Sequence, residues 1–364
     1  MSSDIDKLAE KTANLSIDPV YDTNWCDMPA EIKLECIGKM KFKERMSSDI
    51  EHLTDTTEKL AIDPVYDTNW CDMPDDIKLE CIRKLEFKER CSLRCTAKAE
   101  KSLVDSQKIE FFRGDVYKTN AFQFYESEIV SLTKMNGKEF SIKLENPQEA
   151  LKFLNHILKI GVFEHFIISP ENATVRQGLI NYPGIISSKT IKFNFCGTEI
   201  VVAVLQKMKH GVEFISMYCS EEFDHDFDKI LEILQIQNVP YWFCNYYHKT
   251  DSLHKVARMW IDTQAKVGFT FQVSVYKKGS FEEFSEHFTD RIVSKNEKRV
   301  RIRTNNPDCH ILLERGTVRY YGYIEFFRLL VISVKMKESE YDDNCKEWIM
   351  DMDPTIRCDS YDFL

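Results

Sequence analysis

The sequence predicts a mixed α+β protein in which a small unit of three short helices precedes a larger β/α domain. Residues 70–110 contain three short runs with apolar residues at helical spacing. Residues 120–335 instead alternate strand-like segments with amphipathic helical segments. A chain of 364 residues, 43% of them hydrophobic, is long enough to bury a core in the larger part.

The first 90 residues contain a duplication. Residues 1–45 and 46–90 align without a gap, and 32 of the 45 positions are identical. Two copies are too few for a solenoid, which needs at least about three repeats. Only the second copy continues into further helical sequence, so we expect residues 1–45 to be a partial copy and residues 46–69 to be a linker. Both Met1 and Met46 qualify as the start of the functional unit.

The second copy leads into the three expected helices. Asp72 suits the N-cap of the first helix and Pro74 suits its first turn. A second helix is expected around Arg90 and a third from residue 96 to about residue 105. So small a unit buries little surface alone, which favours a unit that binds a partner; a helical subdomain capping the larger domain is the alternative. One face of the first helix is expected to hold its apolar residues, Ile77, Cys81, Ile82 and Leu85.

The residues of this unit resemble an F-box, a motif that usually opens Leu-Pro-x-Glu-Ile. The sequence of this segment is similar to that of the F-box in the large nematode F-box families. The chain departs from the motif at Met73, which replaces the usual leucine, and in its third helix, which lacks the tryptophan of many F-boxes. The matching residues are, in chain order, Met73, Pro74, Ile77, Ile82, Leu85, Arg90, Leu93 and Arg94.

The resemblance implies a partner and a set of contact residues. An F-box docks on the Skp-family adaptor of an SCF-type cullin ubiquitin ligase, and an amphipathic helix set into an apolar groove is a common binding mode. The residues that would meet the adaptor are Met73, Pro74, Ile77, Ile82, Leu85 and Leu93. The first copy keeps part of this set, as Met28, Pro29, Ile32 and Ile37.

The expected strands of the C-terminal domain recur at a nearly regular interval. They begin at residues 140, 165, 190, 213, 241, 269 and 299, so successive starts lie 23 to 30 residues apart. This interval is close to that of leucine-rich repeats, in which each strand lines one face of the array. Cys196, Cys219 and Cys244 end three of the strands, where leucine-rich repeats often place asparagine or cysteine. A leucine-rich-repeat-like domain is therefore predicted; a plain β/α domain with core cysteines is the alternative.

A second resemblance concerns the same domain. Residues 146–159, and the Trp260-Ile261 pair at an expected helix end, are similar to parts of the FTH domain that follows the F-box in nematode proteins. This resemblance implies that residues 120–335 bind a target protein. It assigns no contact residues.

Composition narrows the class of protein. The net charge of −10 disfavours general binding to nucleic acid. The longest apolar stretch, residues 323–334, is interrupted by Glu325 and Arg328 and is too short for a membrane helix, and the N-terminus has no targeting pattern. The twelve cysteines include no Cys-x-x-Cys pair, which favours reduced, buried thiols. We therefore expect a protein of the cytoplasm, the nucleus or both.

No catalytic or cofactor motif is found in the sequence. It has no glycine-rich phosphate loop, no Gly-x-Ser-x-Gly and no His-Glu-x-x-His. The acidic cluster at residues 221–226 lacks a spacing that selects a metal, and such residues commonly cap a helix. We expect no enzyme activity, no cofactor and no metal.

Two charged segments stand out near the C-terminus. Alternation at residues 298–303 would place Arg299, Arg301 and Arg303 on one face of a strand. A solvated strand face is favoured there, with a basic strip for an acidic target peptide as the alternative. Residues 336–364 are acidic and aromatic and are expected to form a flexible tail.

Together these observations predict an F-box substrate receptor that links a target protein to an SCF-type ligase. The target itself is not predicted. A repeat scaffold that binds a partner outside any ubiquitin ligase is the alternative. An enzyme built on the β/α domain is a third hypothesis, which no motif supports.

Overall fold

The computed structural model divides into two compact units, residues 1–108 and residues 109–364. The first copy of the duplication, with Met28, Pro29, Ile32 and Ile37, lies outside the described residues, as do the expected linker 46–69 and Asp72. The residues that the structure describes are 70, 73–96, 98–118, 128–144, 146–170, 172–220, 222, 225–316, 324–342 and 344–352.

Three short helices form the described part of the first unit, as the sequence predicts. They are α3 (Asp75–Lys84), α4 (Phe87–Arg94) and α5 (Lys98–Ser106). Pro74 lies at the N-cap of α3, and Asp75 and Asp76 lie in its first turn, where negative charge favours the positive end of the helix dipole. The two basic residues in its last turn complement the other end.

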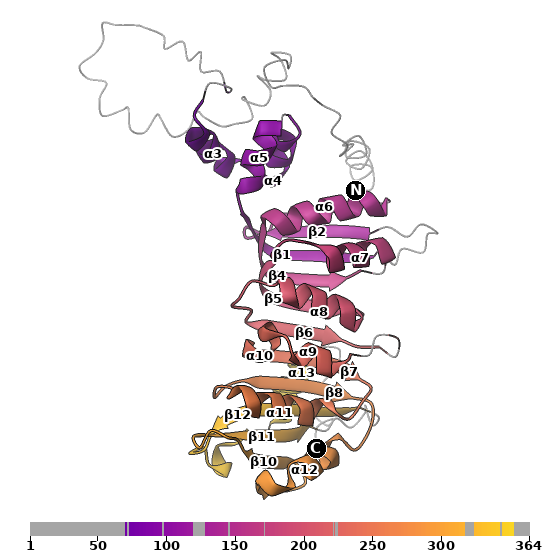
Figure 1. Ribbon diagram of the computed structural model, residues 1–364, viewed down its shortest axis with the longest axis vertical. Helices are drawn as coiled ribbons and strands as arrows, with labels where there is room; N and C mark the ends of the chain where they lie inside the picture. Colours follow the sequence, from indigo (N-terminus) through magenta and orange to yellow (C-terminus); the bar gives the residue numbers. More distant parts are fainter. Residues whose placement is uncertain are drawn as a thin grey trace, which may run out of the picture. The chain divides into compact units, whose positions relative to one another are not determined.

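The second unit is built on one mixed sheet, which contains twelve strands within the described residues. Its central six strands are parallel and stand side by side in chain order (Figure 1). These are β1 (Ile109–Lys118), β4 (Gly161–Ser169), β5 (Ser187–Asn194), β6 (Phe214–Tyr218), β7 (Tyr241–Tyr247) and β8 (Thr270–Val275).

Antiparallel strands extend this parallel region at both edges. The hairpin of β2 (Glu128–Lys134) and β3 (Glu139–Leu144) continues the sheet beyond β1. Beyond β8 the order is β12 (Glu325–Ser333), β11 (Cys309–Gly316), β10 (Arg299–Arg303) and β9 (Ile292–Lys295). The apolar stretch at residues 323–334 thus supplies a sheet strand, β12.

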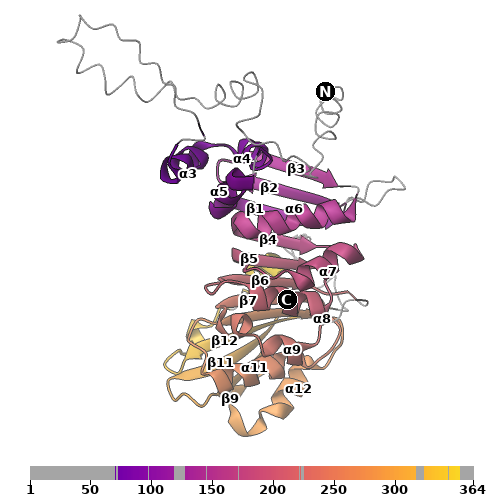
Figure 2. The ribbon, with the colours of Figure 1, turned by 45° about the horizontal axis from the view of Figure 1, so that its top comes forward.

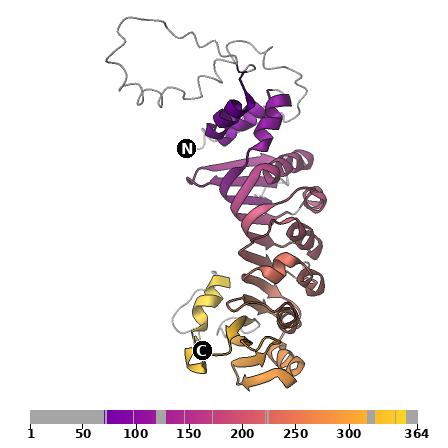
Figure 3. The same cartoon turned by 60° about the vertical axis from the view of Figure 1, so that its left-hand side comes forward.

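The helices that connect the parallel strands lie along one face of the sheet (Figure 3). They are α6 (Pro147–Ile160), α7 (Ala173–Asn181), α8 (Thr198–Lys207), α9 (Phe227–Leu231), α10 (Leu234–Asn238) and α11 (Ser252–Thr263), and α12 (Ser280–His287) follows β8. The seven strands expected from sequence are confirmed, and so are the helices expected between them. The sequence did not predict β1, β2, β9, β11, β12 or α7.

Strand alternation explains why the helices gather on that face. Strand register aligns one residue of each parallel strand from β4 to β8 in a row, and all of them are buried apolar side chains or cysteine. The row consists of Ile168, Phe193, Met217, Cys244 and Val273. The helices contribute apolar residues as well: in α6 these recur at helical spacing, and Leu154, Ile157 and Leu158 are buried.

The opposite face is covered in part by the last helix, α13 (Cys345–Met352). Trp348, Ile349 and Met352 pack there against Phe243 and Phe326. Figure 3 shows this helix, in yellow, across the sheet from the connecting helices. The expectation that residues 336–364 form a flexible tail is therefore wrong for residues 345–352, because three large apolar side chains on one side of a helix need a surface to bury them.

Several smaller expectations concern single residues. The eight cysteines of the described segments are thiols outside any disulfide bond, and four of them, at positions 196, 219, 244 and 309, are buried. In the acidic cluster, Asp226 caps α9 by accepting a hydrogen bond from the backbone N–H of Asp228. Among the described helices, none has the length and apolar character needed to cross a membrane.

Truncation of Trp348 tests the role of α13. We expect Trp348→Ala to destabilise the second unit by about 3–5 kcal/mol, because it removes the largest side chain of the apolar cluster on this face. Met350→Ala, in the same helix but at an exposed position, should change stability by less than about 0.5 kcal/mol. Urea unfolding followed by circular dichroism measures both. Equal stability of the two variants would show that α13 does not hold the sheet.

Candidate functional site

The three helices of the first unit share a small apolar core. It consists of Trp70, Ile82, Leu93 and Val104, with Met73, Cys81, Leu85 and Leu103 packed around it. Ile82 is completely buried and Leu93 nearly so. In this structure both side chains pack inside the unit, and their contact with a partner stays a prediction. So small a unit has few apolar residues, and it uses them first for its own core.

Ile77 and Ile82 also do not share one face of α3, as the sequence suggested. Five residues of α-helix turn through about 500°, which places their side chains about 140° apart. Ile82 accordingly points into the core, whereas Ile77 is 48% exposed.

Arg90 joins α3 to α4. Its guanidinium donates from Nε to the backbone oxygen of Leu85 (3.1 Å) and from a terminal nitrogen to that of Arg83 (2.8 Å). These carbonyls belong to the C-terminal end of α3, which has no intrahelical donors left for them. Burial lowers the pKa of Arg90. The motif arginine is thus a helix cap rather than a surface charge.

Two further polar contacts attach α5. Arg94 of α4 pairs with Asp105 of α5, with 2.7 Å between Nε and Oδ1. The indole N–H of Trp70 donates to the buried carboxylate of Glu100 at 3.1 Å. Because buried polar groups fix geometry through their hydrogen bonds, these contacts set the positions of the three helices.

The exposed apolar side chains of this unit lie at the N-terminal end of α3. Pro74 is exposed, and Ile77 is the one large apolar side chain among the described residues 70–108 that stands exposed. Met73 and Leu85 are half-buried at the edge of the core. Four of the six expected contact residues therefore have side chains that are exposed or half-buried. The other two, Ile82 and Leu93, are buried in the core of the unit.

The second unit offers a different kind of surface, on the sheet face opposite the connecting helices. Register aligns Ile167, Lys192, Ser216 and Phe243 on this face, and the row continues through Gln272. Helix α13 covers the row at Phe243. On β1, β4 and β5 the described side chains of this face remain half-buried or exposed, apart from the buried Asp115.

Polar contacts organise this part of the face. His165 and Thr190 are joined by a hydrogen bond of 2.8 Å, and Arg113 pairs with Asp115 at 2.8 Å. Lys192 places its Nζ 4.4 Å from the centre of the Tyr218 ring, a cation–π distance. Burial, and then the nearby Arg113, lowers the pKa of Lys192. The surface combines aromatic rings with cations and hydroxyl groups.

The arginines of β10 do not form the expected strip. Arg301 is buried and donates to the backbone oxygens of Val334 (2.8 Å) and Met336 (2.7 Å) and to the hydroxyl of Tyr341 (2.8 Å). Its Nε donates to Nδ1 of His310 at 2.8 Å. Both readings of this segment, a solvated face and a basic strip for a target peptide, are therefore wrong for Arg301.

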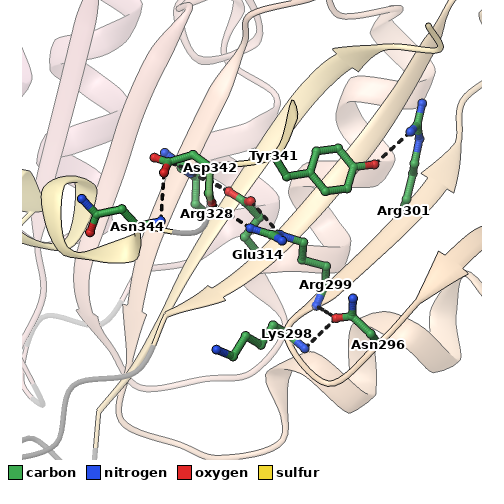
Figure 4. A network of polar contacts seen from close by, with 9 residues as sticks. All are labelled: Asn296, Lys298, Arg299, Arg301, Glu314, Arg328, Tyr341, Asp342 and Asn344. Atoms are coloured by element: carbon green, nitrogen blue, oxygen red, sulfur yellow. Dashed lines mark hydrogen bonds and ion pairs between the residues drawn. The ribbon is translucent and has the colours of Figure 1, made fainter. Parts of the chain in front are cut away.

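Arg299 belongs to the same network. Arg299 and Arg328 both donate to the buried carboxylate of Glu314, at 3.0 and 2.8 Å (Figure 4). Arg299 also donates to the backbone oxygen of Asp342 at 2.7 Å. The network fixes residues 333–342 against the sheet edge, because a buried charge needs partners in the folded chain. Arg303 remains exposed.

Comparison with known protein families supports one part of the chain. Residues 70–112 match the F-box domain. A search of curated proteins and a search of solved structures each returned no match. F-box domains act in substrate recognition by SCF ubiquitin ligases and typically bind a Skp-family adaptor. The chain therefore contains an F-box domain, formed by the helical unit described above.

The division between core and surface in α3 can be tested by truncation. We expect Ile82→Ala to destabilise the helical unit by about 2–4 kcal/mol, because it opens a cavity in a small core, the cluster of Trp70, Ile82, Leu93 and Val104. Ile77→Ala should change stability by less than about 0.5 kcal/mol. Hydrogen exchange of the amides of α3 to α5 in the full chain measures both. The assignment fails if the two variants exchange at the same rate.

Replacement of Arg301 tests the arginine network. Arg301→Met should cost about 3 kcal/mol, because it removes the donors of its hydrogen bonds to Val334, Met336, Tyr341 and His310, whereas Arg303→Met should be nearly neutral. Burial and the nearby Arg301 also lower the pKa of His310 below its ordinary value. The neutral imidazole therefore contributes stability above about pH 6.5 that is lost as the pH falls. Urea unfolding at pH 7.5 and pH 5 measures both effects, and equal stability of Arg301→Met and wild type would refute the network's role.

Proposed function

We propose that this protein is a substrate receptor that carries a target protein to an SCF-type cullin ubiquitin ligase. The F-box domain binds the Skp-family adaptor, and the second unit binds the target. The observation that carries this proposal is the exposed apolar pair Pro74 and Ile77 at the N-terminal end of α3, within the segment that matches an F-box. A receptor of this kind catalyses nothing itself; it raises the concentration of its target near the ligase.

The contacts with the adaptor follow from the exposures of the helical unit. Pro74 and Ile77 make the central contact, and Met73 and Leu85 extend it at the margin of the core. Ile82 and Leu93 act indirectly by holding α3 against α4 and α5. Exposed apolar side chains on a fixed helix favour docking in an apolar groove, since burying them there is favourable and little order is lost.

Target binding is proposed for the open face of the sheet in the second unit. Its parallel strands follow one another in chain order, the connecting helices lie on one face, and α13 covers only part of the other. In leucine-rich-repeat-like arrays the strand face is the binding surface, and this likeness supports the same use here. The half-buried Lys192, the Tyr218 ring and His165 provide the mixture of aromatic and polar contacts common in protein interfaces. An FTH-like domain and a cytoplasmic or nuclear location belong to the same proposal.

The adaptor interface can be tested with the full chain and a purified Skp-family adaptor. We expect the double variant Pro74→Ala, Ile77→Asp to bind the adaptor at least about 30-fold more weakly, because it places a charge in the apolar centre of the contact. Leu234→Asp is the matched control: it adds the same charge at a 58% exposed leucine of α10, and its affinity should equal that of wild type. Isothermal titration calorimetry measures all three.

The outcomes separate the two main hypotheses. Selective loss of binding in the double variant establishes the ligase receptor. No binding by the wild-type chain would overturn the proposal and leave a scaffold that acts outside any ubiquitin ligase. Hydrogen exchange of the amides of α3 to α5 in the double variant is the control for folding: exchange rates equal to those of wild type would show that the loss of binding does not come from unfolding.

A further inference from the structure

Two histidines and a glutamate meet where α11 packs on α12. His254 lies in the first turn of α11, and Glu283 and His287 lie one turn apart on α12. Residues four apart in a helix project from the same face, so Glu283 and His287 point together. The two helices lie next to each other in Figures 1 and 2.

The ligand atoms of these residues converge. Nδ1 of His254 lies 3.3 Å from Oε1 of Glu283, and Nε2 of His287 lies 4.0 Å from the same oxygen. One ligand atom from each of the three residues lies within 4.8 Å of the others. Around a tetrahedral zinc ion with bonds of about 2.1 Å, ligand atoms are about 3.4 Å apart. Small side-chain adjustments would therefore complete this geometry.

Hydrogen bonding does not account for the arrangement. The Nδ1 atom of His254 is buried and makes no hydrogen bond, although the Glu283 carboxylate is near. Buried polar atoms are nearly always paired, so this unpaired nitrogen needs an explanation. The two imidazole rings also stack with their centres 3.8 Å apart, which disfavours a positive charge on both.

Several charged groups lie near His254. Burial lowers its pKa, and so do His287 and the exposed Arg258, while Glu283 and Asp251 act in the opposite direction. Asp251 pairs with Lys255 and with the hydroxyl of Tyr247, so Glu283 is the carboxylate that faces the histidines.

We propose that His254, Glu283 and His287 bind a zinc ion that joins α11 to α12. Two imidazoles and one carboxylate form a ligand set that suits zinc, whereas calcium and magnesium prefer oxygen ligands. The side chain of His287 is 40% exposed, so an ion can enter and water can occupy the fourth position. The site lies outside the F-box domain, and the inference is independent of the proposed function.

No sequence motif indicates this site. Its members are 29 and 4 residues apart along the chain, which matches no metal motif (283 − 254 = 29 and 287 − 283 = 4). The expectation of no metal rested on motifs within one segment, and the ligands here come from two helices that only the fold brings together.

The test uses the full chain after removal of metal with a chelator, in the presence of a reductant. Titration with zinc chloride against a chromophoric competitor gives the number of bound ions, and the cysteines of the chain add a background to that number. We expect His287→Asn and Glu283→Gln each to bind one zinc equivalent fewer than wild type. His210→Asn, at an exposed histidine of a loop, is the matched control and should bind as many ions as wild type.

Cobalt distinguishes this site from cysteine sites. Cobalt(II) bound to nitrogen and oxygen ligands gives visible absorption without a thiolate-to-metal charge-transfer band. We expect this spectrum in wild type and His210→Asn and its loss in the other two variants. Both of those positions are partly exposed, so folding should persist, and circular dichroism checks it. Equal zinc stoichiometry and equal cobalt spectra in all four proteins would overturn the proposal.

Discussion

Burial of one sheet face against the connecting helices is the interaction on which the second unit depends. In each parallel strand every second residue points toward the helices, and register places these residues in continuous apolar rows, of which Phe193 and Met217 are examples. The order of the strands follows from the same constraint. A helix that packs back on its own strand returns the chain to the neighbouring position, so consecutive strands become neighbours in the sheet.

The same alternation creates a second face that the connecting helices cannot cover. Two parts of this face differ in polarity and in exposure. Near β7 and β12 it is apolar and is closed by α13, whose last carbonyl, that of Met352, accepts hydrogen bonds from Tyr218 and Asn245. Near β1, β4 and β5 it is polar and aromatic and remains partly exposed. Closure by α13 in turn relies on residues 333–342, whose backbone oxygens accept hydrogen bonds from Arg299 and the buried Arg301 of β10.

The first unit faces a different constraint, which is the scarcity of apolar residues. A unit of this size must assign each one either to its own core or to its surface. The arginines of the motif reduce the demand on the core, because Arg90 caps α3 and Arg94 attaches α5. This leaves Ile77 free to stand on the surface beside Pro74. The role of each motif residue is thus decided by the geometry of the helix on which it lies.

Local patterns were enough to predict much of this protein. Helical spacing predicted three short helices, the motif at residues 73–94 predicted an F-box, and alternation predicted the strands from β3 to β8 together with β10. Strands β11 and β12 were missed, because they are buried on both faces and their near-continuous apolar residues show little alternation.

Roles that depend on neighbours distant in sequence were decided by tertiary structure alone. Alternation placed Arg299 and Arg301 on a strand face, but only the packing of residues 333–342 made Arg301 a buried donor and Arg299 a half-buried one. Periodicity grouped Ile77 with Ile82, but only the core of three helices separated surface from interior. His254 and Glu283 meet because α11 packs on α12. The physical reason is the same in each case. The local sequence determines the direction in which a side chain points, whereas its environment depends on the segments that the fold brings against it.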